Sequence, residues 1–427
     1  MRPLITKFSG GASSLKDAIP NKLLRRKMPE LDTLRGIAIL AVVFFHGIPR
    51  CDTSGLPRIV GAAVGTIQFG WLGVNLFFVL SGFLITGILL DSKDGPQYYK
   101  RFYVRRALRI LPAYLMLLLL LLVLPRIGIL ERRVSWSFVG VSLIYLSNLA
   151  RFFGLNVEYA PLWSLAVEEQ FYLLWPAAVR NFSRRALTLC ALAVFVGCPL
   201  FRAIGLARGH GGEIWYTWMV ADGLASGSLL AILSRTRLTR RPSMKWFSAL
   251  CVTAPVVLIA LGTRFGTLSP VPPTTILGAS LRGTLFNTLF TGTLGSALLL
   301  GTSRWARIVQ RPVLQFFGEI SYGLYLIHTM VFEVTGHFVT PAAMRLARLT
   351  VHEEFSAILI RFGVGASAAT LLAFLSRRYF EEPFLKFKDK WAANKVESAP
   401  LANLVPIQPV VQTSLAEPCC VSKEANG

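Results

Sequence analysis

The sequence is poor in acidic residues and in cysteine. It has 22 Asp and Glu against 45 Lys and Arg, a net charge of +23, although only 16% of its residues are charged. The six cysteines show neither the spacing of a disulfide framework nor that of a metal site, so we expect no bound metal. A soluble protein this basic would be expected to bind nucleic acid. Membrane proteins instead accumulate Lys and Arg in cytoplasmic loops, so we expect no nucleic-acid partner.

Apolar residues are abundant. They make up 53% of the chain, and apolar runs of nearly twenty residues, the length that spans a bilayer, recur along it. Candidate spans lie near residues 33–50, 66–90, 108–125, 136–150, 160–179, 186–206, 214–234, 246–262, 283–302, 313–335 and 355–376. The sequence therefore predicts an all-α, polytopic membrane protein in contact with membrane lipid.

The distribution of Lys and Arg favours ten crossings over eleven. If every candidate crossed, the basic segments 235–245 and 377–390 would face outward, against the positive-inside rule. Segment 136–150 is short and is interrupted by Ser142, Ser147 and Asn148, which favours an interfacial or re-entrant helix at the outer side. We therefore expect about ten transmembrane helices around a polar cavity, with both termini in the cytoplasm.

Three regions are expected along the chain. Residues 1–28 form a basic cytoplasmic leader, which we expect to be retained because the first apolar stretch lacks a small-residue cleavage site. Residues 29–390 form the membrane domain. Residues 391–427 mix Pro, Ala, Ser and Gln without helical periodicity, which predicts a disordered cytoplasmic tail.

A histidine lies deep in the first span. Arg35 stands at the mouth of that span, and His46 follows roughly 16 Å further along a helix that rises about 1.5 Å per residue. Ionisable residues at membrane depth are costly and usually line a cavity that serves a substrate or a proton path. His46 is therefore the first candidate for chemistry.

Ionisable residues of other spans fall at a similar depth, namely Glu168, Glu169, Asp222 and His328. We expect them to share one polar cavity, although a hydrogen bond that only packs two helices is the alternative for each. Glu168 and Glu169 are adjacent and point about 100° apart on a helix, so they cannot both face the cavity centre. The sequence does not decide which of them does.

A basic cluster precedes the third span. It consists of Lys100, Arg101, Arg105, Arg106 and Arg109, of which Arg106 and Arg109 share one helix face. Planar guanidinium groups match the oxygens of phosphate, so the cluster predicts a phosphate-binding patch. The alternative is an ordinary cytoplasmic anchor.

Six motifs occur in a fixed order. They are LDTLRGIAILAVVFFH, GWLGVNLFFVLSGFLIT, FYVRRALRILPAY, PLWSLAVEEQFYLLWP, ISYGLYLIHTMVF and RRYFEEPF. In this order they resemble the acyltransferase-3 family of integral membrane acyltransferases, which modify sugars and other hydroxyl-bearing acceptors. The resemblance covers residues 29 to about 387.

The resemblance implies an acyl-CoA donor, most simply acetyl-CoA, in the cytoplasm and a sugar or polysaccharide hydroxyl at the outer side. It places the chain in the inner membrane of a bacterium, in modification of the cell envelope. It pairs Arg35 with His46 as essential residues and assigns Arg106 and Arg109 to a paired-arginine motif near the donor. Ser81, with Gly82 and Phe83, matches a small-residue turn. Some relatives carry an appended esterase-like domain, which we do not expect here.

The expected mechanism is acyl transfer with His46 as general base, because a neutral imidazole accepts a hydroxyl proton near pH 7. Glu168 or Glu169 would orient its ring, as the carboxylate does in hydrolase triads. Arg35, Arg105, Arg106 and Arg109 would hold the phosphates of coenzyme A, near Ser81. An acyl-histidine intermediate on His46 is an alternative route.

Two other classes of protein remain open. A proton-coupled transporter of a small solute or acyl group would also place ionisable residues among ten spans, although no inverted repeat is visible. A scaffold subunit of an envelope polysaccharide assembly is the third class. The sequence leaves open the acceptor, the acyl group and the oligomeric state.

Overall fold

The computed structural model describes residues 28–51, 55–209, 215–236, 241–264 and 275–384, together with Arg25, Thr53 and Lys386. All regular secondary structure in these residues is helical, which confirms the all-α prediction. The predicted tail and nearly all of the predicted leader lie outside the described residues.

The long helices are α1 (Pro29–Gly47), α3 (Leu72–Asp91), α4 (Tyr98–Val123), α6 (Leu162–Asn181), α7 (Arg184–Ala207), α9 (Asp222–Leu233), α10 (Arg241–Arg264), α11 (Ile276–Gly301), α13 (Pro312–Ala347) and α14 (Glu353–Leu375). Shorter elements are α2 (Arg58–Ile67), α5 (Trp136–Leu143), the 3₁₀-helix η1 (Ser147–Phe153), α8 (Thr217–Val220), α12 (Ala306–Val309) and the π-helix η2 (Ser376–Glu381).

Several helices start at residues suited to a helix start. Pro29 and Pro312 open α1 and α13, where the missing backbone N–H removes no helical hydrogen bond. The Ser183 hydroxyl caps α7 by accepting a hydrogen bond from the backbone N–H of Ala186 (3.2 Å). Thr275 caps α11 in the same way. These helix starts are therefore set by local sequence.

Six helical segments of the described chain are long and apolar enough to cross a membrane. They are Leu72–Asp91, Tyr98–Val123, Arg184–Ala207, Ser243–Arg264, Ile276–Gly301 and Glu353–Phe384. Large apolar side chains such as Leu189, Trp246 and Leu371 are exposed on them, a surface suited to lipid. The chain is an integral membrane protein by this criterion. The predicted count of ten is not established, because α1, α6, α9 and α13 are not among the six.

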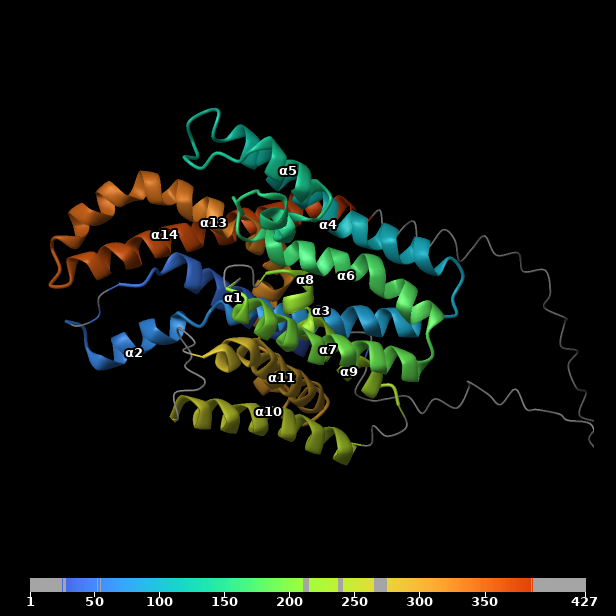
Figure 1. Cartoon of the computed structure of the whole chain (residues 1–427). Helices are drawn as coiled ribbons and strands as arrows, with labels where there is room; N and C mark the ends of the chain where they lie inside the picture. Colours follow the sequence, from blue (N-terminus) through green and yellow to red (C-terminus); the bar gives the residue numbers. More distant parts are fainter. Residues whose placement is uncertain are drawn as a thin grey trace, which may run out of the picture.

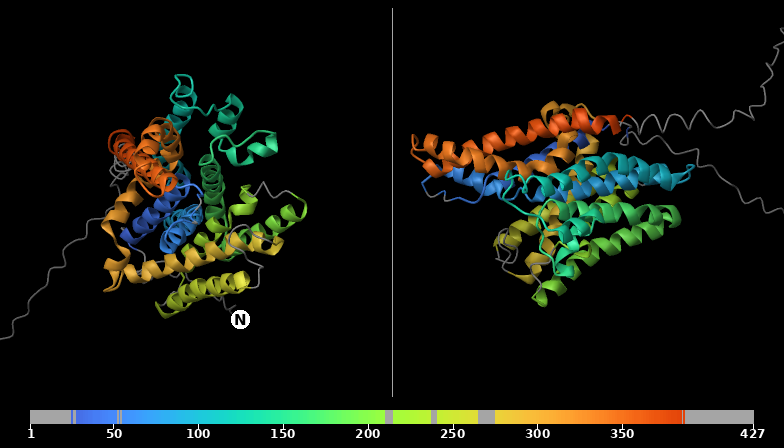
Figure 2. Two further views of the ribbon diagram at one scale, coloured as in Figure 1. Left: turned by 90° about the vertical axis from the view of Figure 1, so that its left-hand side faces the viewer. Right: turned by 90° about the horizontal axis from the view of Figure 1, so that it is seen from above.

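The centre of the bundle is formed by α1 and α3, with α13 and α14 on one side and α10 and α11 on the other (Figures 1 and 2). Two glycines allow α1 to approach α13 closely. A Cβ at Gly36 would lie 1.9 Å from the carbonyl oxygen of Leu314, and one at Gly318 would lie 2.0 Å from that of Asp32. Small residues at such crossings let helix backbones meet. The polar residues of α1 thereby come within reach of α13.

The motif Ser81, Gly82 and Phe83 lies inside α3, so the expectation of a turn there is wrong. A Cβ at Gly82 would lie 2.0 Å from the carbonyl oxygen of Leu224. The small residue therefore serves the packing of α3 on α9 rather than a change of chain direction. Ser81, one position earlier, faces the interior cavity described below.

Segment 136–150 holds two short elements, α5 and η1, instead of one long helix. The eight residues of α5 extend about 12 Å, far less than a hydrocarbon core of about 30 Å. Tyr145, between them, has a positive φ of 56°. The Tyr114 hydroxyl donates to the carbonyl oxygen of Ser142 (2.7 Å) and holds the segment against α4. The segment is therefore not a membrane-length helix.

One end of the bundle carries linked connections between helices. Lys93, after α3, donates to the carbonyl oxygen of Phe182, after α6 (2.9 Å). Arg235, after α9, pairs with Asp91 at the end of α3 (2.7 Å). Leu31, at the start of α1, belongs to the same apolar cluster as Leu230 and Ala231, near the end of α9. We call this the basic end, defined by the α3–α4 and α6–α7 connections and the end of α9.

Candidate active site

A polar cavity of about 90 Å³ lies between α1, α3, α4, α6 and α13. Its polar lining consists of Arg35, Ser81, Arg106, Arg109, Ser164, Glu168, Ser321, Tyr322 and Tyr325. Residues far apart in the sequence therefore meet at one place. Five of them, Arg35, Ser81, Arg106, Arg109 and Glu168, were singled out from the sequence.

Glu168 is the member of the glutamate pair that faces the cavity. It accepts hydrogen bonds from the hydroxyls of Ser81 (3.0 Å) and Tyr172 (3.1 Å). The guanidinium of Arg106 lies over the Tyr172 ring, 3.8 Å from its centroid. Glu169 does not line the cavity, and its Oε1 atom is buried without a hydrogen-bond partner among the described residues.

The cavity has an excess of positive charge. Arg35, Arg106 and Arg109 all line it. The Nε atom of Arg106 is buried and has no hydrogen-bond partner in the described part of the chain. Glu168 contributes a single carboxylate, already engaged by two hydroxyls. Arg105, predicted to join the donor site, is exposed and does not line this cavity.

His46 lies outside the cavity, in the last turn of α1, where its ring meets His328 of α13. Nδ1 of His328 lies 2.8 Å from the carbonyl oxygen of Tyr325, and its Nε2 lies 3.2 Å from Nδ1 of His46. Nδ1 of His46 also lies 3.0 Å from the carbonyl oxygen of Val42. A carbonyl oxygen only accepts, so in the neutral rings each Nδ1 carries the proton. Nε2 of His46 is then the unprotonated nitrogen.

Tyr325 connects this histidine pair to the cavity. Its ring lines the cavity, its hydroxyl lies 2.5 Å from that of Ser164, and its carbonyl oxygen holds His328. We expected a glutamate beside His46, whereas the structure has His328 in that position. The reason is geometric, because both oxygens of the cavity glutamate are engaged by hydroxyls of α3 and α6.

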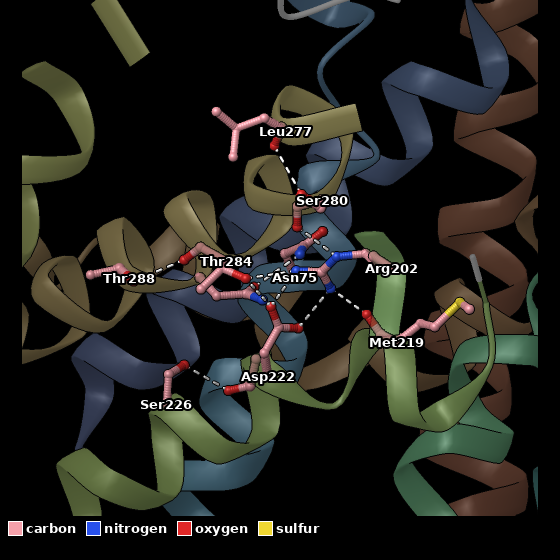
Figure 3. A network of polar contacts seen from close by, with 11 residues as sticks. Asn75, Arg202, Met219, Asp222, Ser226, Leu277, Ser280, Thr284 and Thr288 are labelled. Atoms are coloured by element: carbon pink, nitrogen blue, oxygen red, sulfur yellow. Dashed lines mark hydrogen bonds and ion pairs between the residues drawn. The ribbon is translucent and has the colours of Figure 1, made fainter. Parts of the chain in front are cut away.

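Asp222 belongs to a different polar network, shown in Figure 3. Its carboxylate pairs with the buried guanidinium of Arg202 (2.9 Å) and accepts a hydrogen bond from the Thr284 hydroxyl (2.6 Å). Arg202 also donates to the carbonyl oxygens of Ser280 and Met219. The network joins α7, α8, α9 and α11. Asp222 therefore does not share the cavity, and the packing alternative describes its contacts.

Sequence reasoning missed several residues of the site, namely Ser164, Tyr172, Tyr322 and Tyr325. Helical spacing could have found two of them. Tyr172 follows Glu168 by four positions and Tyr325 precedes His328 by three, so each pair shares a helix face. Within the described residues, no group of three or more His, Cys, Asp or Glu is placed to hold a metal ion.

Three relatives illustrate what this chain is similar to. The peptidoglycan O-acetyltransferase of Listeria monocytogenes is 28% identical over 86% of this chain and 58% of its own length. A putative O-acetyltransferase of Staphylococcus aureus is 27% identical over 84% of this chain and 58% of its own. A putative peptidoglycan O-acetyltransferase of Bacillus subtilis is 35% identical over 35% of this chain and 23% of its own. The chain thus spans 58% of the length of the first two. No solved structure matches it.

A family model described as an acyltransferase domain matches residues 28–378. The match covers most of the chain and includes the histidine pair and every residue that lines the cavity. The six ordered motifs that carried the resemblance begin within the same range. The chain therefore belongs to the acyltransferase-3 family.

Proposed function

We propose that this protein is a membrane-embedded O-acyltransferase. It moves an acyl group, most simply acetyl, from cytoplasmic acyl-CoA to a hydroxyl of a carbohydrate at the outer side of the membrane. The names of its relatives support an O-acetyltransferase and suggest a cell-wall glycan such as peptidoglycan as the acceptor. The observation that carries the proposal is the cavity where Arg35, Arg106 and Arg109 surround one engaged carboxylate within the helical bundle.

The proposed topology has ten crossings and both termini in the cytoplasm. It is supported by the basic end, where Lys93 and Arg235 bind residues of neighbouring connections. The positive-inside rule then makes this end cytoplasmic. The short helices α5 and η1 lie toward the opposite side, as interfacial or re-entrant elements. In this orientation a bacterial inner membrane would present the cavity to a cytoplasmic donor.

The donor site is formed by Arg35, Arg106 and Arg109, which would bind phosphate groups of coenzyme A. Guanidinium groups form charge-assisted hydrogen bonds with phosphate oxygens, and Nε of Arg106 is free to donate one. Ser81 and Tyr172 keep Glu168 engaged, so this carboxylate stays in place beside the arginines. The acyl end would then extend past Tyr325 toward the histidine pair.

His46 acts as the base in this proposal. Its Nε2 takes the proton of the acceptor hydroxyl while the oxygen attacks the thioester carbonyl. The tetrahedral intermediate collapses, the carbon–sulfur bond breaks, and the imidazolium returns the proton to the coenzyme A thiolate. His328 supports the step because its Nε2 accepts from Nδ1 of His46 and keeps the other nitrogen of His46 unprotonated. If His46 attacked the thioester first, the same nitrogen would form an acyl-histidine.

The test separates an enzyme from a transporter. We would purify the full chain in detergent, supply acetyl-CoA with glycan fragments, and measure release of free coenzyme A and the mass of the fragments. The proposal predicts thioester cleavage matched by a gain of one acetyl group on the fragments. Intact acetyl-CoA under conditions where the protein is folded would contradict it and would favour a carrier.

A further inference from the structure

A π-helix ends the membrane region. η2 (Ser376–Glu381) continues α14 and packs against α4 and α13, two helices that line the cavity. It holds most of the motif RRYFEEPF, to which the proposed function assigns no role. π-helices are rare, and they occur often at functional sites because the extra residue per turn redirects side chains.

Two adjacent arginines of η2 have different surroundings. Arg378 is exposed and forms an ion pair with Glu382 one turn later (2.9 Å). Arg377 is half-buried, and its Nη1 atom is buried without a hydrogen-bond partner among the residues described. A buried donor left unpaired costs about 1–3 kcal/mol, and more when it is charged. Arg377 is therefore placed to bind a group that the described residues do not supply.

The surroundings of Arg377 point to an anion. Its helix η2 packs against α4, the helix that carries Arg109, and Arg109 lines the cavity together with Arg35. Glu381, the nearby carboxylate of η2, is 7% exposed, and its Oε1 atom has no hydrogen-bond partner in the described chain. An arginine with an unpaired buried nitrogen, on a helix that packs against the helix of Arg109, favours an anionic ligand with several oxygens.

We propose that Arg377 is a further donor-binding residue, and that η2 brings it beside Arg109 so that both bind one phosphate group of a phosphorylated nucleotide. This inference rests on the proposed function, because the nucleotide would be the head of the acyl-CoA donor. It adds a contact from the last membrane helix to the site formed by α1 and α4.

The experiment uses the full chain in lipid nanodiscs, with adenosine 3′,5′-bisphosphate and coenzyme A as probes in titration calorimetry. Arg377→Gln should weaken binding of both probes about tenfold or more, because a charge-assisted contact to phosphate is lost. Arg378→Gln, the matched neighbour, should bind within about twofold of the unmodified chain. Thermal melting of each variant establishes that it is folded.

Arg106→Gln separates this inference from the proposed function. If Arg106→Gln weakens binding and Arg377→Gln does not, the role of Arg377 is overturned and the donor cavity stands. If neither variant weakens binding, both are overturned. Should Arg377→Gln fail to fold, phenylglyoxal labelling of the unmodified chain gives the answer. The bisphosphate should protect Arg377 from labelling and leave Arg378 reactive, and equal labelling with and without it would refute the inference.

Discussion

The protein holds two sets of arginines with buried guanidinium nitrogens, and the sets differ in how fully those nitrogens are paired. Every nitrogen of the Arg202 guanidinium donates a hydrogen bond, to Asp222, Thr284 or backbone carbonyl oxygens. By contrast, two buried nitrogens have no hydrogen-bond partner in the described chain: Nε of Arg106, which lines the cavity, and Nη1 of Arg377. A buried charge whose hydrogen bonds are all satisfied by the protein, such as that of Arg202, stabilises the packing of helices. Incompletely paired charges that meet at a cavity are suited to a ligand.

The largest effect is expected at His46, which the proposed function makes the base of the acyl transfer and which belongs to neither set of arginines. His46→Ala should lower the rate of acyl transfer about 10²- to 10⁴-fold, because the proton acceptor is lost. The melting temperature should change little, since His46 is exposed. Radiolabelled acetyl transfer and thermal melting of the same preparation check this. A rate near that of the unmodified protein would remove His46 from the role of base.

Substitution of the fully paired arginine, Arg202, should lower the stability of the protein rather than its activity. Arg202→Met leaves Asp222 buried without its cation, and we expect a loss of about 3–5 kcal/mol of stability. The double variant Arg202→Met with Asp222→Leu should recover much of that loss, because an apolar pair replaces the ion pair. Thermal melting measures both variants, and the activity per folded molecule should stay near normal. An equal loss in single and double variants would argue against the ion pair as the cause.

Substitution of Arg106, which lines the cavity, should weaken the affinity for acyl-CoA. Arg106→Gln should raise KM for acyl-CoA about tenfold, because a contact to phosphate is lost, with a much smaller effect on KM for the acceptor. Steady-state kinetics with each substrate varied in turn provides the measurement. If both KM values rise equally, the two arginine sites do not differ in the way proposed here.

The smallest effect is expected at the positioning residue His328. His328→Leu should lower kcat roughly tenfold, because His46 loses the hydrogen-bond acceptor that keeps the proton on its Nδ1 atom. KM for acyl-CoA should stay unchanged. His328→Gln should restore part of the rate, because an amide oxygen can accept the hydrogen bond from Nδ1 of His46. If kcat of His328→Leu is as high as kcat of His328→Gln, His328 only fills space.

The sequence predicted most of the helical segments, because long apolar runs are local signals, but it expected one helix over 136–150 where the structure has the short elements α5 and η1. It did not predict which glutamate faces the cavity, since hydropathy does not fix the rotation of α6 about its axis. It placed His46 and His328 at a similar depth but did not predict their direct contact, which depends on the glycine-mediated crossing of α1 and α13. Asp222 was placed in the wrong network because similar depth does not mean proximity across a bundle.

We propose that one protein carries an acyl group from a donor on one side of a membrane to an alcohol on the other. Proteoliposomes with the purified chain, acetyl-CoA labelled in the acetyl group at the basic end only, and glycan fragments on the opposite side test it directly. We expect labelled fragments and free coenzyme A in equal amounts. Donor that stays intact, or label that crosses as free acetate while the fragments stay unlabelled, would contradict it.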